Sequence, residues 1–225
     1  MTLTSMDFSR IVAAQALLTD IDEATYYPLT IVARAKLPSR YGDFEIVAFS
    51  PTPDGKDNIA MVRGDVANAE TVPLRLHSEC LTGDVMGSLR CDCRDQLEAA
   101  LKYMAERECG AVLYLRQEGR GIGLANKIKA YTLQEQGLDT VEANHELGFE
   151  DDERNYTIAA EMLKALGIKR VQLLSNNPKK IAGLQENGIA VDARVPHVMP
   201  SNEHNHFYLQ TKARKSGHLI DLTQV

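Results

Sequence analysis

Three cysteines stand close together in the segment HSECLTGDVMGSLRCDC, residues 77–93, and they are the strongest constraint on how this chain can fold. Cys80, Cys91 and Cys93 fall within fourteen residues, in a polar loop that also carries acidic residues. In an extended or turn-like backbone, side chains two positions apart can project to one side, so Cys91 and Cys93 could form a pair of thiolates. Cys80 would close the set from the other end of the loop. The pattern is typical of a metal site with one coordination position left open.

The cysteine loop admits three interpretations. Ordinary buried thiols are the simplest, since cysteine is among the most buried residue types, but clustering beside carboxylates argues against them. A structural zinc site needs a fourth protein ligand, for which His77 at the end of the preceding strand is the nearest candidate. A catalytic site keeps water as the fourth ligand and lowers its pKa to ~7. The residues alone leave structural and catalytic zinc about equally supported, whereas Cys109 is expected in the core.

Size, charge and cysteine usage narrow the class of protein. The chain has 225 residues and a net charge of −6, so it offers no basic field that could hold a nucleic acid polymer. Four cysteines, three of them crowded together, indicate metal binding or catalysis rather than a disulfide framework. The first twenty residues lack the features of a signal peptide, and no apolar run approaches the ~18 residues of a membrane span. We therefore expect a cytoplasmic protein with no membrane partner.

The apolar pattern predicts an α/β (mixed) fold. A short helix is expected over residues 8–18, within an N-terminal extension of residues 1–30 whose role stays open. Apolar runs rich in β-branched residues then predict an N-terminal antiparallel β meander, residues 29–36, 43–49 and 58–64. A fourth strand, residues 71–77, leads into the cysteine loop.

Beyond the loop, helical and strand patterns alternate. Helices are expected over residues 95–107, 124–137 and 155–166 and from Pro178 onward, with strands at 110–116, 170–175 and 189–195. Such alternation places helices on a mixed sheet. We expect one catalytic domain, residues 31–220, in which the meander is followed by a mixed sheet flanked by helices.

Three further segments carry glycines or polar residues next to the expected strands and helices. RQEGRGIGLAN, residues 116–126, has glycines that would let a phosphate approach, although unusual dihedrals at a helix start explain them better. HELGFEDDERNY, residues 145–156, places acidic residues where they favour a helix N-terminus, with an arginine suited to phosphate. LLSNNPKK, residues 173–180, lies where nucleotides often bind in α/β sheets, or is an asparagine cap with solvated lysines. No one of these segments decides a function.

Together and in this order, these segments make the sequence similar to GTP cyclohydrolase II, which opens guanine nucleotides at the start of riboflavin synthesis. The resemblance runs from ARAKLP, residues 33–38, through RLHSECLTGDVMGSLRCDC, EGR, DTVEANHELGF, DDERNY and NNPKK to TKARKSGHL near Gly217. Two positions depart from the common pattern: Gly121, where many relatives carry Asn, and Ser175, where Thr is common. No dihydroxybutanone phosphate synthase segment precedes the match, so we expect the monofunctional form.

The resemblance implies a fold like that of GTP cyclohydrolase II, and it implies a ligand set. Cys80, Cys91 and Cys93 would hold one Zn²⁺ per subunit, and Mg²⁺ would accompany the GTP phosphates. The GTP site would comprise Arg75, Leu76, His77, Ser78, Glu79, Gln96, Glu118, Gly119, Arg120, Thr140, Ser175 and Lys180. Glu118 and Gln96 are suited to reading the guanine edge or to handling protons.

The resemblance also implies catalytic roles for three residues. Asp152 matches a proposed proton acceptor, and Tyr131 matches a tyrosine associated with the second ring-opening step. Arg154 matches a residue proposed to attack or stabilise the α-phosphate, and stabilisation is easier because a guanidinium with a pKa above ~12 is a poor nucleophile.

The activity implied is hydrolysis of GTP to formate, pyrophosphate and 2,5-diamino-6-ribosylamino-4(3H)-pyrimidinone 5′-phosphate by a homodimer. Two alternatives are a paralogue that stops at the formamidopyrimidine and an inactive protein that binds zinc and nucleotide.

Overall fold

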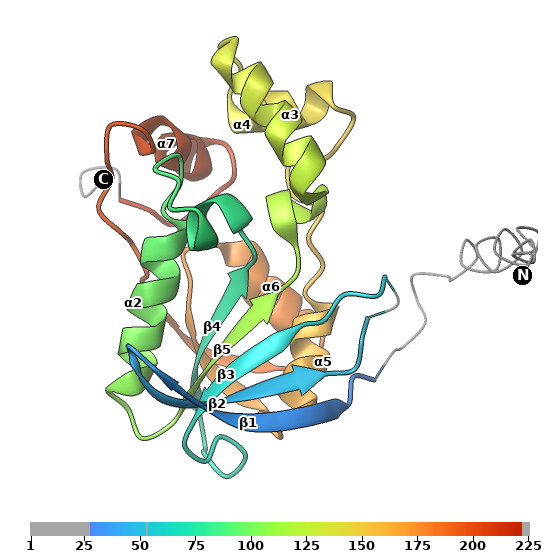
Figure 1. Cartoon of the computed structure of the whole chain (residues 1–225), viewed down its shortest axis with the longest axis vertical. Helices are drawn as coiled ribbons and strands as arrows, with labels where there is room; N and C mark the ends of the chain where they lie inside the picture. The colour runs from blue at the N-terminus through green and yellow to red at the C-terminus, as the bar shows by residue number, and fades with distance from the viewer. Residues whose placement is uncertain (1–27, 53, 222–225) are drawn as a thin grey trace, which may run out of the picture.

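The computed structural model describes residues 28–52 and 54–221, and the helix expected over residues 8–18 lies outside them. The described part is built on a seven-stranded sheet, in the order β1-β2-β3-β5-β4-β6-β7 (Figure 1). Its strands are β1 (Ile31–Ser39), β2 (Gly42–Phe49), β3 (Ile59–Arg63), β4 (Val72–Ser78), β5 (Gly110–Leu115), β6 (Arg170–Leu174) and β7 (Ala190–Val195). This is the mixed α/β fold that the alternation of apolar patterns predicts.

The sheet has an antiparallel half and a parallel half. Strands β1, β2 and β3 form the expected meander, and β3 pairs antiparallel with β5. Strand β4 pairs parallel with both β5 and β6, and β6 pairs parallel with β7. Because the carboxyl ends of parallel strands meet at one edge, the segments that follow β4, β5 and β6 are brought together there, although they lie far apart in the sequence.

Helices cover both faces of the sheet, and each face has its own apolar core. Helix α2 (Cys93–Ala105) packs Leu101 and Met104 against Phe44 and neighbouring strand residues. Helices α5 (Thr157–Ala165) and α6 (Pro178–Glu186) cover the other face, where the larger core includes Met162 and Leu184. In both cores the helices present apolar residues at helical spacing, as the sequence predicts.

Three further helices lie beyond the carboxyl edge of the parallel strands. Helix α3 (Gly123–Glu135) and the short α4 (Thr140–Glu146) project above the sheet, and α7 (His206–Arg214) lies across from them (Figure 1). The apolar pattern of the sequence predicts α3 but neither α4 nor α7. Short α4 begins at Asp139, whose side chain accepts hydrogen bonds from the backbone of Val141 and Glu142 in a capping box.

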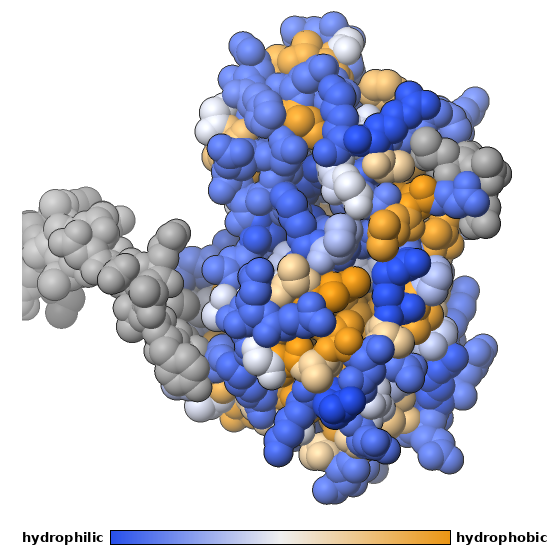
Figure 2. All heavy atoms as spheres, turned by 180° about the vertical axis from the view of Figure 1, so that it is seen from behind, coloured by the Kyte–Doolittle hydropathy of each residue, from blue (hydrophilic) through white to orange (hydrophobic). Residues whose placement is uncertain are grey.

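The surface is polar, as expected for a chain in which 25% of the residues are charged. Seen from behind, it is mainly hydrophilic, with apolar side chains gathered over the lower part of the molecule (Figure 2). Among the residues that the structure describes, no helix is both long enough and apolar enough to cross a membrane.

Candidate active site

The candidate site lies where β4, β5 and β6 end. Strand β4 runs into a single π-helical turn, η1 (Leu81–Val85), and β5 into a 3₁₀ turn, η2 (Glu118–Gly121). Strand β6 leads to α6, which Asn177 caps by accepting a hydrogen bond from the Lys179 backbone, with Pro178 at the first helical position. The carboxyl edge of a parallel sheet is the usual ligand-binding edge in α/β proteins.

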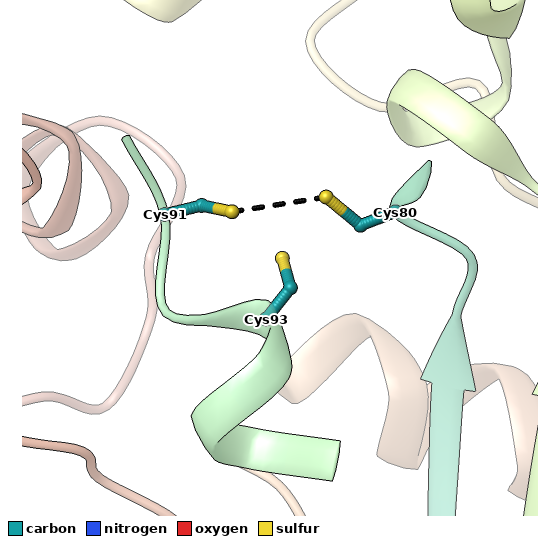
Figure 3. Close-up of side chains that lie close together, drawn as sticks. All are labelled: Cys80, Cys91 and Cys93. Carbon is teal, nitrogen blue, oxygen red and sulfur yellow. Dashed lines mark hydrogen bonds between the residues drawn. The ribbon is translucent and has the colours of Figure 1, made fainter. Parts of the chain in front are cut away.

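The three thiols of the cysteine loop converge, as the spacing predicts. Cys80 and Cys91 Sγ lie 3.7 Å apart, and all three sulfurs fall within 4.8 Å of one another (Figure 3). A tetrahedral zinc site with Zn–S bonds of about 2.3 Å puts its sulfurs about 3.8 Å apart. The thiols therefore fit such an ion, and they are the only potential metal cluster among the described residues.

Gly83 is what lets the loop close around the thiols. A Cβ built on this glycine would lie 2.8 Å from Cys91 Sγ and 3.1 Å from Cys80 Sγ. Its backbone N–H instead points at Cys80 Sγ, 3.4 Å away. Any larger residue would push into the volume that a metal ion needs, so the packing of this turn is specific to the cluster.

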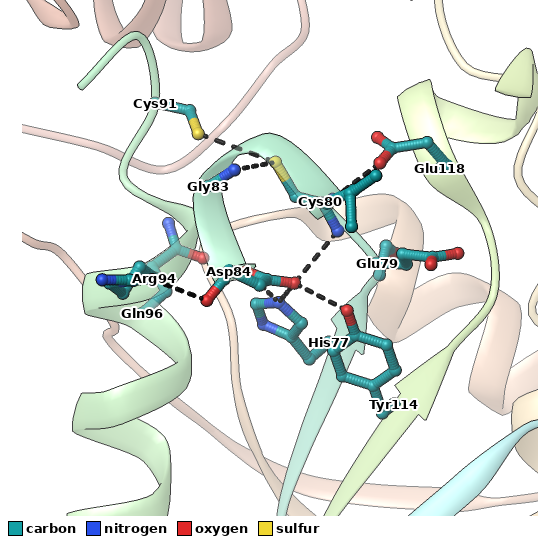
Figure 4. Close-up of polar contacts among 12 residues, drawn as sticks. His77, Glu79, Cys80, Gly83, Asp84, Cys91, Arg94, Gln96, Tyr114 and Glu118 are labelled. Atoms are coloured by element: carbon teal, nitrogen blue, oxygen red, sulfur yellow. Dashed lines mark hydrogen bonds and ion pairs between the residues drawn. The ribbon is translucent and has the colours of Figure 1, made fainter. Parts of the chain in front are cut away.

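The Asp84 side chain holds the η1 turn through hydrogen bonds, and His77 contacts the same carboxylate. The Asp84 Oδ2 accepts hydrogen bonds from the Cys80 backbone N–H at 3.0 Å and the Tyr114 hydroxyl at 2.9 Å (Figure 4). His77 Nε2 lies 3.0 Å from the same oxygen, and both side chains are almost fully buried. His77 is therefore engaged with Asp84 and not with the thiols, so that the three cysteines are the side chains here that could hold an ion.

Lys127 and Glu118 form the other support of the cluster. Lys127 Nζ lies 3.1 Å from Cys80 Sγ and 2.7 Å from Glu118 Oε1, while Glu118 also accepts a hydrogen bond from the Leu81 backbone N–H at 2.7 Å. Hydrogen bonds from the Cys91 and Cys93 thiols, with the Lys127 ammonium beside them, hold the pKa of Cys80 well below its ordinary value. Glu118 thus supports the cysteine loop, and its predicted part in reading guanine or handling protons stays a prediction.

A cavity opens in front of the thiols, and we call it the thiol cavity. All three cysteines line it, together with residues of η2, α3 and α4. Of the residues implied by the resemblance, it gathers Glu79, Glu118, Gly119, Thr140 and Tyr131. The Tyr131 hydroxyl lies 3.3 Å from the Thr82 hydroxyl, and burial raises the pKa of Tyr131, so its phenol stays protonated at neutral pH.

A second cavity adjoins the first, and we call it the cationic cavity. Ser78, Cys93, Arg120, Arg154 and Tyr208 line both. Of the expected residues, the cationic cavity also gathers Arg75, His77, Gln96, Ser175 and Lys180. Only Leu76 and Asp152 of the expected set line neither cavity: the Leu76 carbonyl accepts a hydrogen bond from Lys180 Nζ at 2.7 Å, and Asp152 lies behind Arg154.

The turn η2 aims Arg120 into both cavities. Arg120 has φ 60°, in the left-handed region that non-glycine residues rarely adopt, between Gly119 at φ 63° and Gly121 at φ 101°. Its guanidinium donates to the Asp151 carbonyl at 3.2 Å. The unusual dihedrals foreseen from the glycines are present, and they serve to place a charged side chain. At Gly121 a Cβ would lie 2.9 Å from Glu153 Cβ, so an Asn at this position would require Glu153 to shift.

Positive charge in the cationic cavity exceeds the carboxylates that compensate it. Five cationic side chains line it: Arg75, Arg120, Arg154, Lys180 and Lys212. Carboxylates pair with only two of the five, Asp152 with Arg154 at 2.6 Å and Asp92 with Lys212 at 3.1 Å. The other three donate to neutral oxygens, such as the Leu174 carbonyl that accepts from Arg75 at 2.9 Å. Five cations less two carboxylates leaves a formal charge of +3 when all five side chains are protonated.

The pKa values of Lys180 and Arg75 are consistent with this excess of positive charge in the cationic cavity. Burial, together with the charges of Arg75 and Arg154, holds the pKa of Lys180 well below its ordinary value. Burial also lowers the pKa of Arg75 to about 10. Buried like charges disfavour one another and favour an anion placed among them. The cavity is therefore suited to a polyanion.

Several residues that line the two cavities are not among the site residues predicted from the sequence. Lys127 follows the glycine-rich turn within a segment recognised for its glycines, and Arg90 lies inside the cysteine loop itself. Tyr208, Lys212 and His218 lie at the C-terminal end, in or beside the TKARKSGHL segment, to which no role was given. The sequence signal for this segment is the concentration of positive charge at Lys212, Arg214 and Lys215.

Comparison with known proteins gives a family model and curated relatives that carry the same family name. The model of the family "GTP cyclohydrolase II" matches residues 30–196. Relatives named GTP cyclohydrolase-2 from Cronobacter sakazakii and Citrobacter koseri are each 56% identical over 189 residues, covering 84% of this chain and 96% of theirs. The Escherichia coli relative of the same name is 56% identical over 190 residues, covering 84% of this chain and 97% of its own. A solved two-domain 3,4-dihydroxy-2-butanone 4-phosphate synthase from A. baumannii shows 15% identity and a TM-score of 0.43, over 83% of this chain and 44% of that one.

Proposed function

The chain belongs to the GTP cyclohydrolase II family, and from this we propose that it is a zinc-dependent hydrolase of GTP in riboflavin biosynthesis. The reaction would open the imidazole ring of guanine and release formate and pyrophosphate, leaving 2,5-diamino-6-ribosylamino-4(3H)-pyrimidinone 5′-phosphate. The observation that carries the proposal is the pair of adjoining cavities, one lined by three thiols and the other lined by five cationic side chains. GTP carries a base and a triphosphate joined by a ribose, so its binding requires two adjoining cavities of different chemistry.

The thiol cavity would receive the guanine ring. Cys80, Cys91 and Cys93 would hold zinc, which supplies Lewis acidity and lowers the pKa of water to about 7. Lys127 places one positive charge beside Cys80, and Glu118 keeps Lys127 in place. Protonated Tyr131 would act as a hydrogen-bond donor at the far side of the ring.

The cationic cavity would receive the triphosphate. Lys180 and Arg75 offer buried charge at its floor, where charge-assisted hydrogen bonds to phosphate are strong. Mg²⁺ is expected to arrive with the triphosphate, held chiefly through its oxygens.

Arg154 and Asp152 act as a pair in this proposal. Burial acts against the charge of Arg154, but the hydrogen bonds from Arg154 to Asp152 raise the pKa of the guanidinium above its ordinary value. Arg154 therefore stays charged and would stabilise the α-phosphate as pyrophosphate leaves. The same pair, against the effect of burial, holds the pKa of Asp152 below its ordinary value, so Asp152 is a weak base. We infer that Asp152 orients Arg154, in place of the proton-acceptor role that the resemblance implied.

We also propose that the protein is cytoplasmic and works as a homodimer, as the resemblance implies. Light scattering of the purified protein checks the dimer.

Product analysis tests the function. Incubation with GTP and Mg²⁺ should yield one formate and one pyrophosphate per GTP, with the diaminopyrimidinone product identified by mass spectrometry. A formamidopyrimidine product would indicate the paralogue that stops after the first cleavage, and GTP binding without any product would indicate an inactive protein.

The metal is tested with matched cysteine variants. Cys91→Ser should lose zinc, measured by inductively coupled plasma mass spectrometry, and turnover should fall by about 10³-fold or more because the zinc-supplied water is lost. Cys109→Ser is the control, because Cys109 is a half-buried free cysteine that packs beside the core. Normal turnover by a protein verified as zinc-free would contradict the proposal.

A further inference from the structure

The outer side of the cationic cavity is built by a segment that lies beyond the part of the chain matched by the family model. That match ends at residue 196, whereas Tyr208, Lys212, His218 and Ile220 all line the cavity. We propose that residues 206–220 complete the phosphate subsite, with Lys212 as a further binding residue for the triphosphate. This inference rests on the proposed function and adds to it a second source of phosphate contacts.

Lys212 has the position that a phosphate ligand requires. Its side chain is only 11% exposed and its Nζ lies 3.1 Å from Asp92 Oδ1. Its Nζ also lies 4.2 Å from the centre of the Tyr208 ring. An ammonium has three N–H donors, and Asp92 accepts one of them. Asp92 compensates the charge of Lys212, but the side chain lines a cavity that also holds Arg75 and Lys180, with which no carboxylate of the described residues pairs, and an anion there is favoured.

The orientation of α7 is the reverse of what a simple structural cap requires. Phe207 is 62% exposed, while Tyr208 and Lys212 turn toward the cavity. Leu209 does anchor the helix in the protein, with 2% of its surface exposed. A helix that served only to cover the sheet would bury Phe207 and leave Lys212 in water.

The segment is anchored to elements that surround both cavities. The Leu219 backbone N–H donates to the Asn176 carbonyl at 2.8 Å, next to the start of α6. The Ser216 hydroxyl accepts from Arg120 at 3.4 Å, and Lys215 pairs with Glu142 of α4 at 2.9 Å. These contacts fix residues 206–220, which form the outer wall of the cationic cavity, relative to Arg120 and the N-terminus of α6.

His218 adds shape rather than charge to this wall. Burial, followed by the positive charges of Lys212 and Arg120, lowers the pKa of His218 to about 3. Its imidazole is therefore neutral at neutral pH, and Lys212 is the cation that residues 206–220 contribute to the cavity.

The inference is tested with inorganic tripolyphosphate, which carries the phosphate chain but no guanine. Calorimetric titration of the full-length, zinc-loaded protein should show binding, and Lys212→Met should raise the Kd about tenfold or more, as expected for loss of a charge-assisted hydrogen bond. Lys212→Arg, which keeps the charge, should recover most of the affinity. Arg214→Met is the matched control, because Arg214 lies on the same helix, is exposed and lines neither cavity. Its Kd should change less than about twofold.

Two results overturn the inference: the same Kd in Lys212→Met and the wild-type protein, or no binding of tripolyphosphate by the wild type. Both are independent of the proposed function, because formate release from GTP by the wild type is measured separately. Zinc content and circular dichroism are recorded for each variant. If Lys212→Met loses its zinc or does not fold, Tyr208→Phe is measured in its place, since this change removes only one hydroxyl from the same wall. Its Kd should then rise about threefold, in line with the loss of one hydrogen bond, and an unchanged Kd overturns the inference.

Discussion

The thiol cavity and the cationic cavity adjoin, yet their charges are arranged in opposite ways. Around the thiols, Lys127 meets both Cys80 and Glu118, and Asp84 meets three donors, so the polar groups are matched before any ligand arrives. In the cationic cavity, Arg75, Arg120 and Lys180 donate only to neutral oxygens. The difference indicates that the first cavity is organised to hold an ion in place, whereas the second is organised to receive charge and release it.

The largest effect that separates the two cavities is expected from Lys180→Met. Lys180 is 5% exposed and would make more than one charge-assisted contact with phosphate. Its loss should lower kcat/KM for GTP about 100-fold, which corresponds to about 2.7 kcal/mol. Zinc content should stay at the wild-type level, measured by plasma mass spectrometry. The exposed neighbour Lys179, changed to Met, is the control; a loss of zinc from Lys180→Met would show that the cavities are not separable.

A smaller effect of the opposite kind is expected from Lys127→Met. The change removes the N–H donor to Cys80 and leaves the buried Glu118 carboxylate without its cation. Zinc affinity should fall about tenfold or more, as for other groups that support metal ligands. Competition with a chromophoric chelator measures it, and the Kd for tripolyphosphate should change little. Lys129→Met, exposed and two residues away, should leave zinc affinity unchanged; equal zinc affinity in the Lys127 variant would refute the supporting role.

The pair between Asp152 and Arg154 should contribute to stability with a definite pH dependence. Because the pKa of Asp152 is lower in the folded protein than in an unfolded chain, its contribution is present above the unfolded pKa of about 3.9 and is lost as pH falls through the folded pKa. Asp152→Asn should cost about 2 kcal/mol of unfolding free energy at pH 7, and the difference should shrink below about pH 4. Urea unfolding of zinc-free protein at both pH values checks this. A difference that grows on acidification would reverse the assignment.

The smallest effect is expected at the rim of the thiol cavity. Asp139 caps α4, accepting hydrogen bonds from Val141 N–H at 2.8 Å and Glu142 N–H at 3.0 Å. Asp139→Ala should lower the free energy of unfolding by about 1 kcal/mol and leave zinc content unchanged. Thermal unfolding with parallel zinc quantification measures both. Zinc loss in this variant would mean that α4 supports the metal loop as well as the rim.

The sequence is informative about the fold wherever apolar residues have a clear period. The strands and the helices that cover the sheet follow that period within a few residues. Helix α4 is not predicted because it has seven residues and few apolar ones. Helix α7 is not predicted because its sequence, HFYLQTKAR, has no apolar stripe. Local sequence also could not show that Asp84 holds His77, since that pairing depends on a π-helical turn.

For the site, the cysteine cluster could be found from spacing, because its residues are local. The cationic cavity could not, because Arg75 and Lys180 meet only through the parallel pairing of β4 with its neighbours. The resemblance supplied most of those residues, but not Lys127 or Lys212. Both of these contact site residues far away in the sequence, Cys80 and Asp92, which no local pattern reveals.

The central place of β4 has a consequence for hydrogen exchange. Strand β4 is paired on both sides, with β5 and with β6, and Leu74 and Leu76 within it are fully buried. Its amide protons should exchange with solvent only when the whole protein unfolds. The amides of η2 and α4, which border the thiol cavity from outside the sheet, should exchange through local opening. The floor and the rim of one site would therefore differ in protection, so that the rim can open to substrate while the strand that carries Arg75 and His77 stays closed.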